Sequence, residues 1–387
     1  MVKRQSEKLI RQYARQFRAL AVVGPRQSGK TTLVRSVFHK KPYVSLEDPD
    51  ERLFADQDPR AFLSRFKNGA IIDEAQRVPA LFSYLQKILD ETKKDGLFIL
   101  TGSNNFLLQQ SISQSLAGRI GYIDLFPLSL QEIRSFSNAS MDTDDLILNG
   151  SYPELYDKKR KAALWYPSYI RTYVERDVKQ IRNIDNTILF NRFLKLCAGR
   201  TGQQLVVSAL SNDCGIDVKT VNSWLSILES SYVIHLLSPH HKNFNKRLVK
   251  TPKLYFVDTG LACSLLGIKS VNELKHSHLR GALFENLVVN ELLKEKFNHG
   301  SNDGIYFWRD NKGVEIDVLM EKGKKLIPFE IKSAQTFNSS FLSSLGLWNK
   351  YSGLKGGHLY YDGKQEMDTR EGIKVRNWKT DFLLKSR

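Results

Sequence analysis

The stretch Gly24-Pro25-Arg26-Gln27-Ser28-Gly29-Lys30-Thr31-Thr32 follows directly on the apolar run Ala19 to Val23 and has the pattern G-x-x-x-x-G-K-[ST]. Its two glycines let the backbone turn sharply and aim N–H groups at phosphate oxygens, and a helix starting near Lys30 would direct its positive end at the same anion. We expect Lys30 to pair with the β- and γ-phosphates of a nucleotide and the Thr31 hydroxyl to hold Mg²⁺. A glycine-rich turn can match this pattern by chance, but the preceding strand and following helix favour an ATP site formed by residues 24–32.

A second apolar run, Ala70-Ile71-Ile72, ends in the carboxylates of Asp73 and Glu74. A phosphate loop of this kind needs an acid on a neighbouring buried strand, so we expect Asp73 to reach the magnesium ion through its water shell. Glu74 would polarise the water that attacks the γ-phosphate. An acidic pair at a strand end can also be a solvated turn, and the upstream phosphate loop weighs against that interpretation. A further strand, Phe98 to Thr101, leads to Ser103, a candidate sensor of the γ-phosphate.

Length and composition set the general class. A chain of 387 residues exceeds what one hydrophobic core organises, which predicts two or three domains. The hydrophobic share of 41% and the charged share of 26% are typical of a globular protein, and no apolar run reaches the roughly eighteen residues of a membrane span. The N-terminus lacks the apolar core of a signal peptide, and three scattered cysteines suggest buried thiols, so we expect a cytoplasmic location.

The chain is strongly basic, with a formal net charge of +17, and such a surface attracts polyanions. DNA is the natural candidate partner. Part of the excess recurs every three or four residues near the N-terminus, where it predicts one basic side of a helix: Arg4, Lys8, Arg11, Arg15 and Arg18. An ordinary solvated helix face is the alternative.

Short apolar runs alternate with helical patterns over the first half, which predicts an α/β fold with a parallel sheet covered by helices. The expected strands are 19–23, 43–45, 70–73, 98–101 and 121–125. With its helical segment ending at Arg119, this half resembles the AAA+ ATPases. In that family an arginine just before the fifth strand reaches the neighbouring subunit's γ-phosphate, so the resemblance implies a homo-oligomer with Arg119 as a catalytic residue in trans. A salt-bridging surface arginine is the alternative.

The next segments extend the resemblance to nearly the whole chain. With the phosphate loop, the runs 149–154, 165–166 and 173–178 are similar to a large prokaryotic family of AAA+-type ATPases that carry an uncharacterised C-terminal region. In related ATPases a Gly-x-Pro turn of the helical lid lies near the adenine, which implies that Tyr152 and Pro153 border the base. Arg176 is a second candidate phosphate sensor, or a member of lid salt bridges.

Residues 193–266 read as a helix-turn-helix followed by a β-hairpin. Val206 to Ser211 predicts a first helix, and Val218 to Leu228 a second, capped by Asp217. The basic run from His240 to Lys250 resembles the wing of a winged helix, which implies a recognition helix in the major groove and wing lysines on phosphate. Winged helices also serve as protein–protein modules, which leaves that alternative open.

The C-terminal part carries a second constellation. Three strands are expected, over 305–309, 314–319 and 326–332, and alternation places Glu330 and Lys332 on one face of the third. The pattern of Asp317, Glu330 and Lys332 resembles the D…ExK core of restriction-endonuclease-like nucleases, and Glu285 resembles its helical acid. The resemblance implies that Glu285, Asp317 and Glu330 hold Mg²⁺ and that Lys332 orients the attacking water. Ile316 stands where the family usually has proline, and a charged strand edge is the alternative.

These observations predict four parts: an AAA+ P-loop core (1–130), a helical lid (131–190), a winged helix-turn-helix (191–270) and a restriction-endonuclease-like α/β domain (271–387). The leading hypothesis is an ATP-hydrolysing protein that acts on DNA and whose C-terminal site cuts it, in DNA processing or defence. The alternative is a regulatory ATPase whose C-terminal domain binds without cutting. ATP and Mg²⁺ are the expected cofactors, and DNA is expected to bind through the wing and the N-terminal helix.

Overall fold

The computed structural model describes residues 2–102, 112, 115–174, 186–240 and 250–384. It divides into two compact units, the first comprising Met1–Leu128 with Ser230–Tyr232 and Phe297–Ser301, the second comprising Ser129–Glu229, Val233–Lys296 and Asn302–Arg387. The division into four parts stays a prediction. No helix in the described part of the chain is long and apolar enough to cross a membrane.

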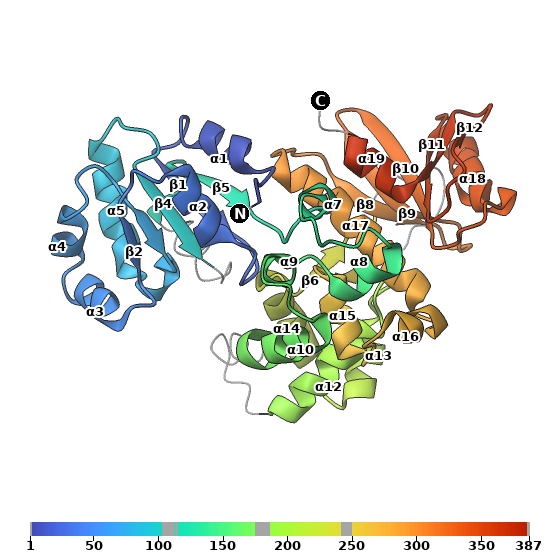
Figure 1. Ribbon diagram of the computed structural model, residues 1–387, viewed down its shortest axis with the longest axis horizontal. Coiled ribbons are helices and arrows are strands. Elements are labelled where there is room, and N and C mark those ends of the chain that lie inside the picture. Colours follow the sequence, from blue (N-terminus) through green and yellow to red (C-terminus); the bar gives the residue numbers. More distant parts are fainter. Residues whose placement is uncertain (1, 103–111, 113–114, 175–185, 241–249, 385–387) are drawn as a thin grey trace. The chain divides into compact units, whose positions relative to one another are not determined.

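The first unit, whose residues 1–128 run from blue to cyan in Figure 1, is built on a five-stranded parallel sheet in the order β2-β3-β4-β1-β5. Its elements are α1 (Glu7–Tyr13), β1 (Ala19–Val23), α2 (Lys30–Val37), β2 (Tyr43–Ser45), α3 (Pro49–Gln57), α4 (Pro59–Ser64), β3 (Ile71–Asp73), η1 (Ala75–Arg77), α5 (Ala80–Glu91), β4 (Phe98–Gly102) and β5 (Ile120–Asp124). The predicted parallel sheet is confirmed, and each expected strand begins and ends within one residue of the observed one.

The core of this unit explains why its strands are continuously apolar. Every residue of β1 is buried, and alternate side chains such as Leu20 and Val22 pack with Ile10 of α1 and Val34 of α2. Because helices cover a parallel sheet on both faces, both sets of alternating side chains are apolar. Burying each such side chain stabilises the fold by roughly 1.5–3 kcal/mol. The parallel arrangement brings the carboxyl ends of β1 and β3 to one edge, where the phosphate loop and Asp73 follow.

The second unit contains helices followed by a mixed six-stranded sheet in the order β12-β13-β11-β10-β9-β8. Its helices are α7 (Leu130–Arg134), α8 (Thr143–Asn149), α9 (Pro153–Asp157), α10 (Ala162–Tyr169), η2 (Ile170–Val174), α12 (Thr187–Ala198), α13 (Val207–Cys214), α14 (Val218–Ser230), α15 (Thr259–Leu265), α16 (Val271–His276), α17 (Arg280–Asn298), η3 (Ser339–Leu342), α18 (Ser343–Ser352) and α19 (Trp378–Leu384). Its strands are β6 (Ile234–Leu237), β7 (Lys253–Phe256), β8 (Ile305–Arg309), β9 (Glu315–Lys322), β10 (Lys325–Lys332), β11 (Gly357–Tyr361), β12 (Met367–Asp368) and β13 (Ile373–Asn377).

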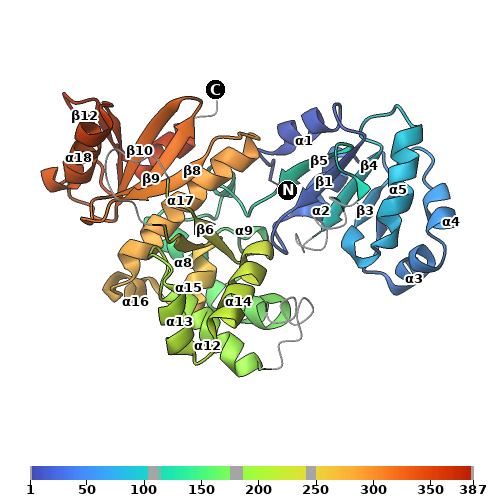
Figure 2. The ribbon, with the colours of Figure 1, turned by 180° about the vertical axis from the view of Figure 1, so that it is seen from behind.

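The predicted pair of helices and the hairpin after them are present. The side chain of Asp217 accepts a hydrogen bond from the Thr220 N–H at 2.9 Å, so it caps α14 as expected. Val221, Leu225 and Leu228 face inward, and β6 pairs antiparallel with β7. Figure 2 shows α12, α13 and α14 gathered below β6. The wing residues 241–249 lie outside the described residues, so the winged helix stays a prediction.

The N-terminal basic helix differs from its prediction. The helix covers only Glu7–Tyr13, and Arg4 before it is buried, donating to the carbonyl oxygens of Ser28 and Phe126 at 2.7 Å each. Arg11 donates to Glu7 at 2.9 Å, and Arg18 donates to the Leu89 carbonyl at 2.7 Å. The expectation of one solvent-facing stripe that includes Arg4 is wrong, because that guanidinium is needed to satisfy carbonyls beside the phosphate loop.

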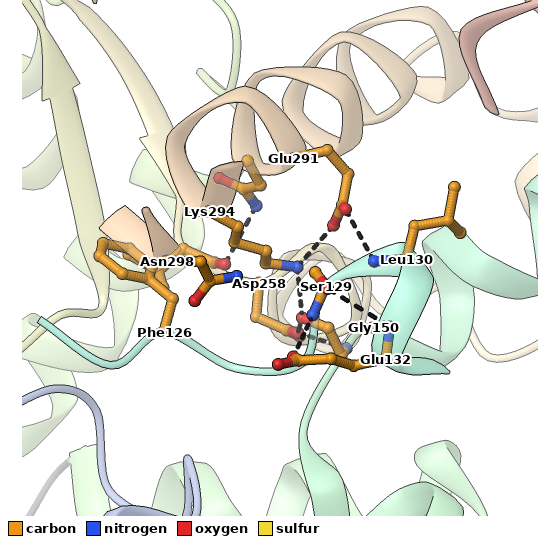
Figure 3. A network of polar contacts seen from close by, with 12 residues as sticks. Phe126, Ser129, Leu130, Glu132, Gly150, Asp258, Glu291, Lys294 and Asn298 are labelled. Atoms are coloured by element: carbon orange, nitrogen blue, oxygen red, sulfur yellow. Dashed lines mark hydrogen bonds and ion pairs between the residues drawn. The ribbon is translucent and has the colours of Figure 1, made fainter. Parts of the chain in front are cut away.

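A buried polar network crosses the second unit (Figure 3). The Lys294 ammonium of α17 donates to Glu291 at 2.8 Å and to the Ser151 hydroxyl at 3.1 Å, and that hydroxyl donates to Asp258 at 2.9 Å. Glu291 also accepts from the Leu130 N–H at 2.7 Å, at the start of α7. Buried polar groups are costly unless they are paired, so this chain of contacts fixes the relative positions of α7, α15 and α17.

Candidate functional site

The phosphate loop lies between β1 and α2, as the sequence predicts. Gly24 has a φ of 147° and Gly29 a φ of 91°, and a Cβ at Gly24 would come within 2.2 Å of the Leu125 carbonyl oxygen. Both positions therefore require glycine. The buried Lys30 ammonium donates to the carbonyl oxygens of Gly24 at 3.0 Å and Pro25 at 2.8 Å.

The Asp73 carboxylate, at the end of β3, accepts hydrogen bonds from three hydroxyl groups of the described residues. It accepts from Thr31 at 3.0 Å, from Tyr43 at 2.8 Å and from Thr101. The pKa of Tyr43 rises to about 12, first because of burial and then because of the Asp73 charge. A carboxylate beside a threonine hydroxyl is the oxygen donor set that suits a hydrated Mg²⁺, so these residues fit the expected ion. Neither the contact of Tyr43 nor that of Thr101 is predicted by the sequence motifs.

Glu74 follows with φ 53° and ψ 43°, in the left-handed region. Its carboxylate accepts from the Gln76 side-chain amide at 2.5 Å. A non-glycine residue in this region costs about 1–3 kcal/mol and persists only where its surroundings enforce it, and such residues cluster at functional sites.

Arg119 precedes β5 and makes a two-point ion pair with Asp90, from Nε to Oδ1 at 2.5 Å and from Nη2 to Oδ2 at 3.1 Å. The pairing raises the pKa of Arg119 and lowers that of Asp90. Ile120 pairs with Ala19, so Arg119 lies at the amino ends of the strands, opposite the phosphate loop of its own unit. The salt-bridging alternative matches this geometry, and a role in trans stays a prediction.

Three other expected nucleotide contacts remain predictions. Ser103 and Arg176 lie outside the described residues. Pro153 begins α9, and the preceding Tyr152 is buried among Trp165, Tyr166 and Tyr169, with its hydroxyl 2.9 Å from that of Tyr169. Tyr152 is therefore a core residue of the second unit.

The C-terminal constellation is assembled from α17, β9 and β10. Glu285 comes from the helix, while Asp317 of β9 accepts from the Ile331 N–H of β10 at 2.8 Å, which holds it beside Glu330. Lys332 donates to Glu330 at 2.5 Å, so the two side chains share a face as the alternation predicts. Burial, together with the charges of Glu330 and Glu285, raises the pKa of Asp317 well above its usual range. Burial is also the first cause that raises the pKa of Glu330.

Two residues of β7 complete this cluster, and neither is part of the predicted site. Lys253 and Tyr255 are two apart in a strand and so share a face. The Lys253 ammonium lies 2.8 Å from Glu285, 2.7 Å from Glu315 and 3.9 Å from Asp317, and the Tyr255 hydroxyl donates to Glu285 at 2.5 Å. The Lys-x-Tyr alternation was the available signal, but Lys253 comes only three residues after the basic run assigned to the wing. From here we call Glu285, Glu315, Asp317 and Glu330, with Lys253 and Lys332, the carboxylate–lysine cluster.

The cluster as it stands does not fit the expected metal ion. Within the described residues no group of three or more His, Cys, Asp or Glu is arranged to hold a metal. The Lys253 ammonium lies among the carboxylates that would have to converge on the ion. One observation points the other way: the buried Oε2 of Glu330 has no hydrogen-bond partner in the described part of the chain.

Comparison with known proteins agrees with the nucleotide-site geometry. The family model of an AAA domain matches residues 16–134, and two domains of unknown function, DUF8612 and DUF4143, match residues 140–272 and 280–380. Residues 16–134 are therefore an AAA-type P-loop ATPase domain.

The relatives define the family of the whole chain. An uncharacterised protein of Mycobacterium tuberculosis is 31% identical over 320 residues, covering 81% of this chain and 70% of that protein. The chain belongs to the same family as this protein. An uncharacterised protein of Haemophilus influenzae is 22% identical over 80% of this chain and 76% of its own length.

Solved structures are similar at a coarser level. The Walker-type ATPase PABY2304 of Pyrococcus abyssi has a TM-score of 0.46 and 15% identity, covering 67% of this chain and 94% of that chain. The RuvB Holliday junction branch migration motor of Thermotoga maritima has a TM-score of 0.33 and 18% identity, covering 60% and 89%.

Proposed function

We propose that this chain is an ATP-hydrolysing AAA-type protein that acts on DNA, and that the carboxylate–lysine cluster cleaves the DNA backbone. In the first unit, Lys30 exchanges its loop carbonyls for the β- and γ-phosphates, and Thr31 with Asp73 holds the hydrated Mg²⁺ that neutralises phosphate charge. Glu74 orients and deprotonates the attacking water, and Gln76 holds the Glu74 carboxylate until ATP is bound.

Charge and exposure support DNA as the partner. The net charge is +17, and α14 presents Lys219 and Asn222 to solvent beside its buried face. Lysine and asparagine are residue types that contact phosphates and base edges, respectively. We propose that α14 and the wing bind duplex DNA.

The observation that carries the cleavage proposal is the convergence of Glu285, Asp317 and Glu330 with Lys332. These residues come from three elements, and burial, together with the charge of Glu285, raises the pKa values of Asp317 and Glu330. In this proposal Lys332, which donates to Glu330, holds a nucleophilic water or a phosphate oxygen beside that carboxylate.

The second candidate function, a regulatory ATPase that binds without cutting, is favoured by one observation. Lys253 occupies the space between the carboxylates, so the cluster in this state is a closed ion-pair network. Such a network holds elements together and need not turn over a substrate.

One experiment separates the two. ATP turnover and DNA cutting are measured with and without duplex DNA, with Mg²⁺ or Mn²⁺, at low and high salt, because phosphate contacts weaken with salt. We expect DNA to stimulate turnover at low salt, and Asp317→Ala to abolish cutting while Glu371→Ala, an exposed carboxylate between β12 and β13, retains it. If DNA stimulates ATP turnover in a salt-sensitive way but is not cut with either metal, the regulatory function remains. If DNA does not change ATP turnover, DNA is refuted as the partner.

Assembly through Arg119 is part of the proposal. Arg119 would leave Asp90 to meet the γ-phosphate of a neighbouring subunit. The specific activity of the ATPase should then rise with protein concentration, and inactive Arg119→Ala subunits should lower the activity of added wild-type subunits. Activity independent of concentration and of such mixing would contradict it.

A further inference from the structure

The carboxylate–lysine cluster has an unusual balance of charge for a buried site. Four carboxylates face three cationic groups, since Arg309 also donates to Glu315 at 2.8 Å beside Lys253 and Lys332. Lys253 is the most deeply placed of the three, with its side chain 3% exposed. An ammonium in such a place is tolerated only because several carboxylates surround it.

That ammonium lies among the carboxylate oxygens that a bound cation would need. It lies within 2.8 Å of oxygens from both Glu285 and Glu315, and Asp317 is 3.9 Å away. A metal ion binds through carboxylate oxygens at about 2.0–2.6 Å, so the same oxygens cannot serve both cations at once. The partnerless Oε2 of Glu330 marks a side of the cluster that the ammonium does not satisfy.

We propose that Lys253 is the resident cation of this site and competes with divalent metal ions, so that Mg²⁺ binds only by displacing the Lys253 ammonium. The inference rests on the proposed cleavage function, for which it explains how the site can be complete and yet closed in the metal-free protein. Lys253, on the β6–β7 hairpin, is then a determinant of the metal affinity of the cluster.

The test is Mn²⁺ binding measured by titration calorimetry without nucleotide, on the full chain carrying Lys30→Ala so that the phosphate loop holds no nucleotide–metal complex. In this parent we expect Lys253→Met to bind Mn²⁺ at least about tenfold more tightly, because a competing buried charge is removed. Lys253→Arg keeps the charge, and Lys250→Met removes a charge from an exposed position; both should bind Mn²⁺ as the parent does. Adding Asp317→Asn to Lys253→Met should remove the gain.

Thermal unfolding of the same variants serves as the control for correct folding. Lys253→Met leaves carboxylates without their cation, so it should unfold at a lower temperature than the parent without metal and recover when Mn²⁺ is added. A loss that Mn²⁺ does not restore, or affinity equal to the parent's, would overturn the inference and leave Lys253 a structural ion pair. If the wild-type protein cuts DNA while Lys253→Met shows no gain, only this inference fails; if the wild type also does not cut, the cleavage proposal fails with it.

Discussion

Asp258 offers the sharpest test of what holds the second unit together. Its buried carboxylate accepts from the Ser151 N–H at 2.7 Å, the Ser151 hydroxyl at 2.9 Å, the Tyr166 hydroxyl at 2.6 Å and the Leu261 N–H at 3.0 Å, where it caps α15. Asp258→Ala leaves the two backbone N–H groups without an acceptor, whereas the Tyr166 hydroxyl can still donate to the Asn149 carbonyl.

The expected magnitude follows from those two groups. A buried donor without a partner costs about 1–3 kcal/mol, and the value for Leu261 includes the lost helix cap. We therefore expect Asp258→Ala to lower the free energy of unfolding of the second unit by about 2–6 kcal/mol. Tyr166→Phe removes one donor from a carboxylate that keeps three others, so it should cost only about 1 kcal/mol.

The sequence provides a selective probe for this measurement. All five tryptophans lie in the second unit: Trp165, Trp224, Trp308, Trp348 and Trp378. Urea unfolding followed by tryptophan fluorescence therefore reports on that unit, even though a chain with two units need not unfold in one step. A change below about 1 kcal/mol for Asp258→Ala, or a Tyr166→Phe effect as large as that of Asp258→Ala, would refute the reasoning.

Three further predictions concern nucleotide binding and pH. Lys30→Ala should abolish ATP binding in a fluorescent-nucleotide assay, whereas Glu74→Gln should bind ATP and retain it unhydrolysed; normal turnover by Glu74→Gln would contradict its role. Arg4→Met strands two buried carbonyls beside the phosphate loop and should lower ATP affinity by about tenfold, while Lys3→Met at the neighbouring exposed position should not. Burial lowers the pKa of His235 to about 4, so below about pH 6.5 the unfolded chain binds a proton that the folded chain does not, and stability falls as the pH drops toward 4. Since the ring keeps some exposure, His235 should account for about 1–2 kcal/mol of this loss, and His235→Gln should unfold with a shallower dependence on pH between 7 and 4.5.

The first unit was predictable because its signals are local. The phosphate loop carries its own glycine pattern, and each buried parallel strand is a short apolar run bounded by turns, so the sequence predicts strand ends to within a residue. Arg4 was mispredicted because spacing along a helix says nothing about carbonyl groups from a distant segment. The acceptors of its guanidinium are Ser28 and Phe126, and the latter is 122 positions away.

The carboxylate–lysine cluster was half predictable for the same reason. Asp317, Glu330 and Lys332 lie on adjacent strands of one meander, where alternation decides which side chains meet. Lys253 and Tyr255 enter from a hairpin that is not part of that sheet, and their contacts with Glu285 span about thirty residues. In the sequence, a lysine near a basic stretch is typical of surface charge. Its burial depends on carboxylates that only the fold brings close to it.

The two sites share a consequence that sequence motifs do not convey. In each, a buried lysine already has oxygen partners from the chain: Lys30 the carbonyls of its own loop, Lys253 the carboxylates of Glu285 and Glu315. Nucleotide binding at the phosphate loop, and metal binding at Lys253 as proposed above, would each be an exchange of partners. Only the difference between new and old contacts contributes to affinity. Since the carbonyls that Lys30 leaves are neutral and a triphosphate is highly charged, exchange at the phosphate loop favours the ligand. At Lys253 the old partners are themselves charged, so the exchange proposed there would favour the ligand less.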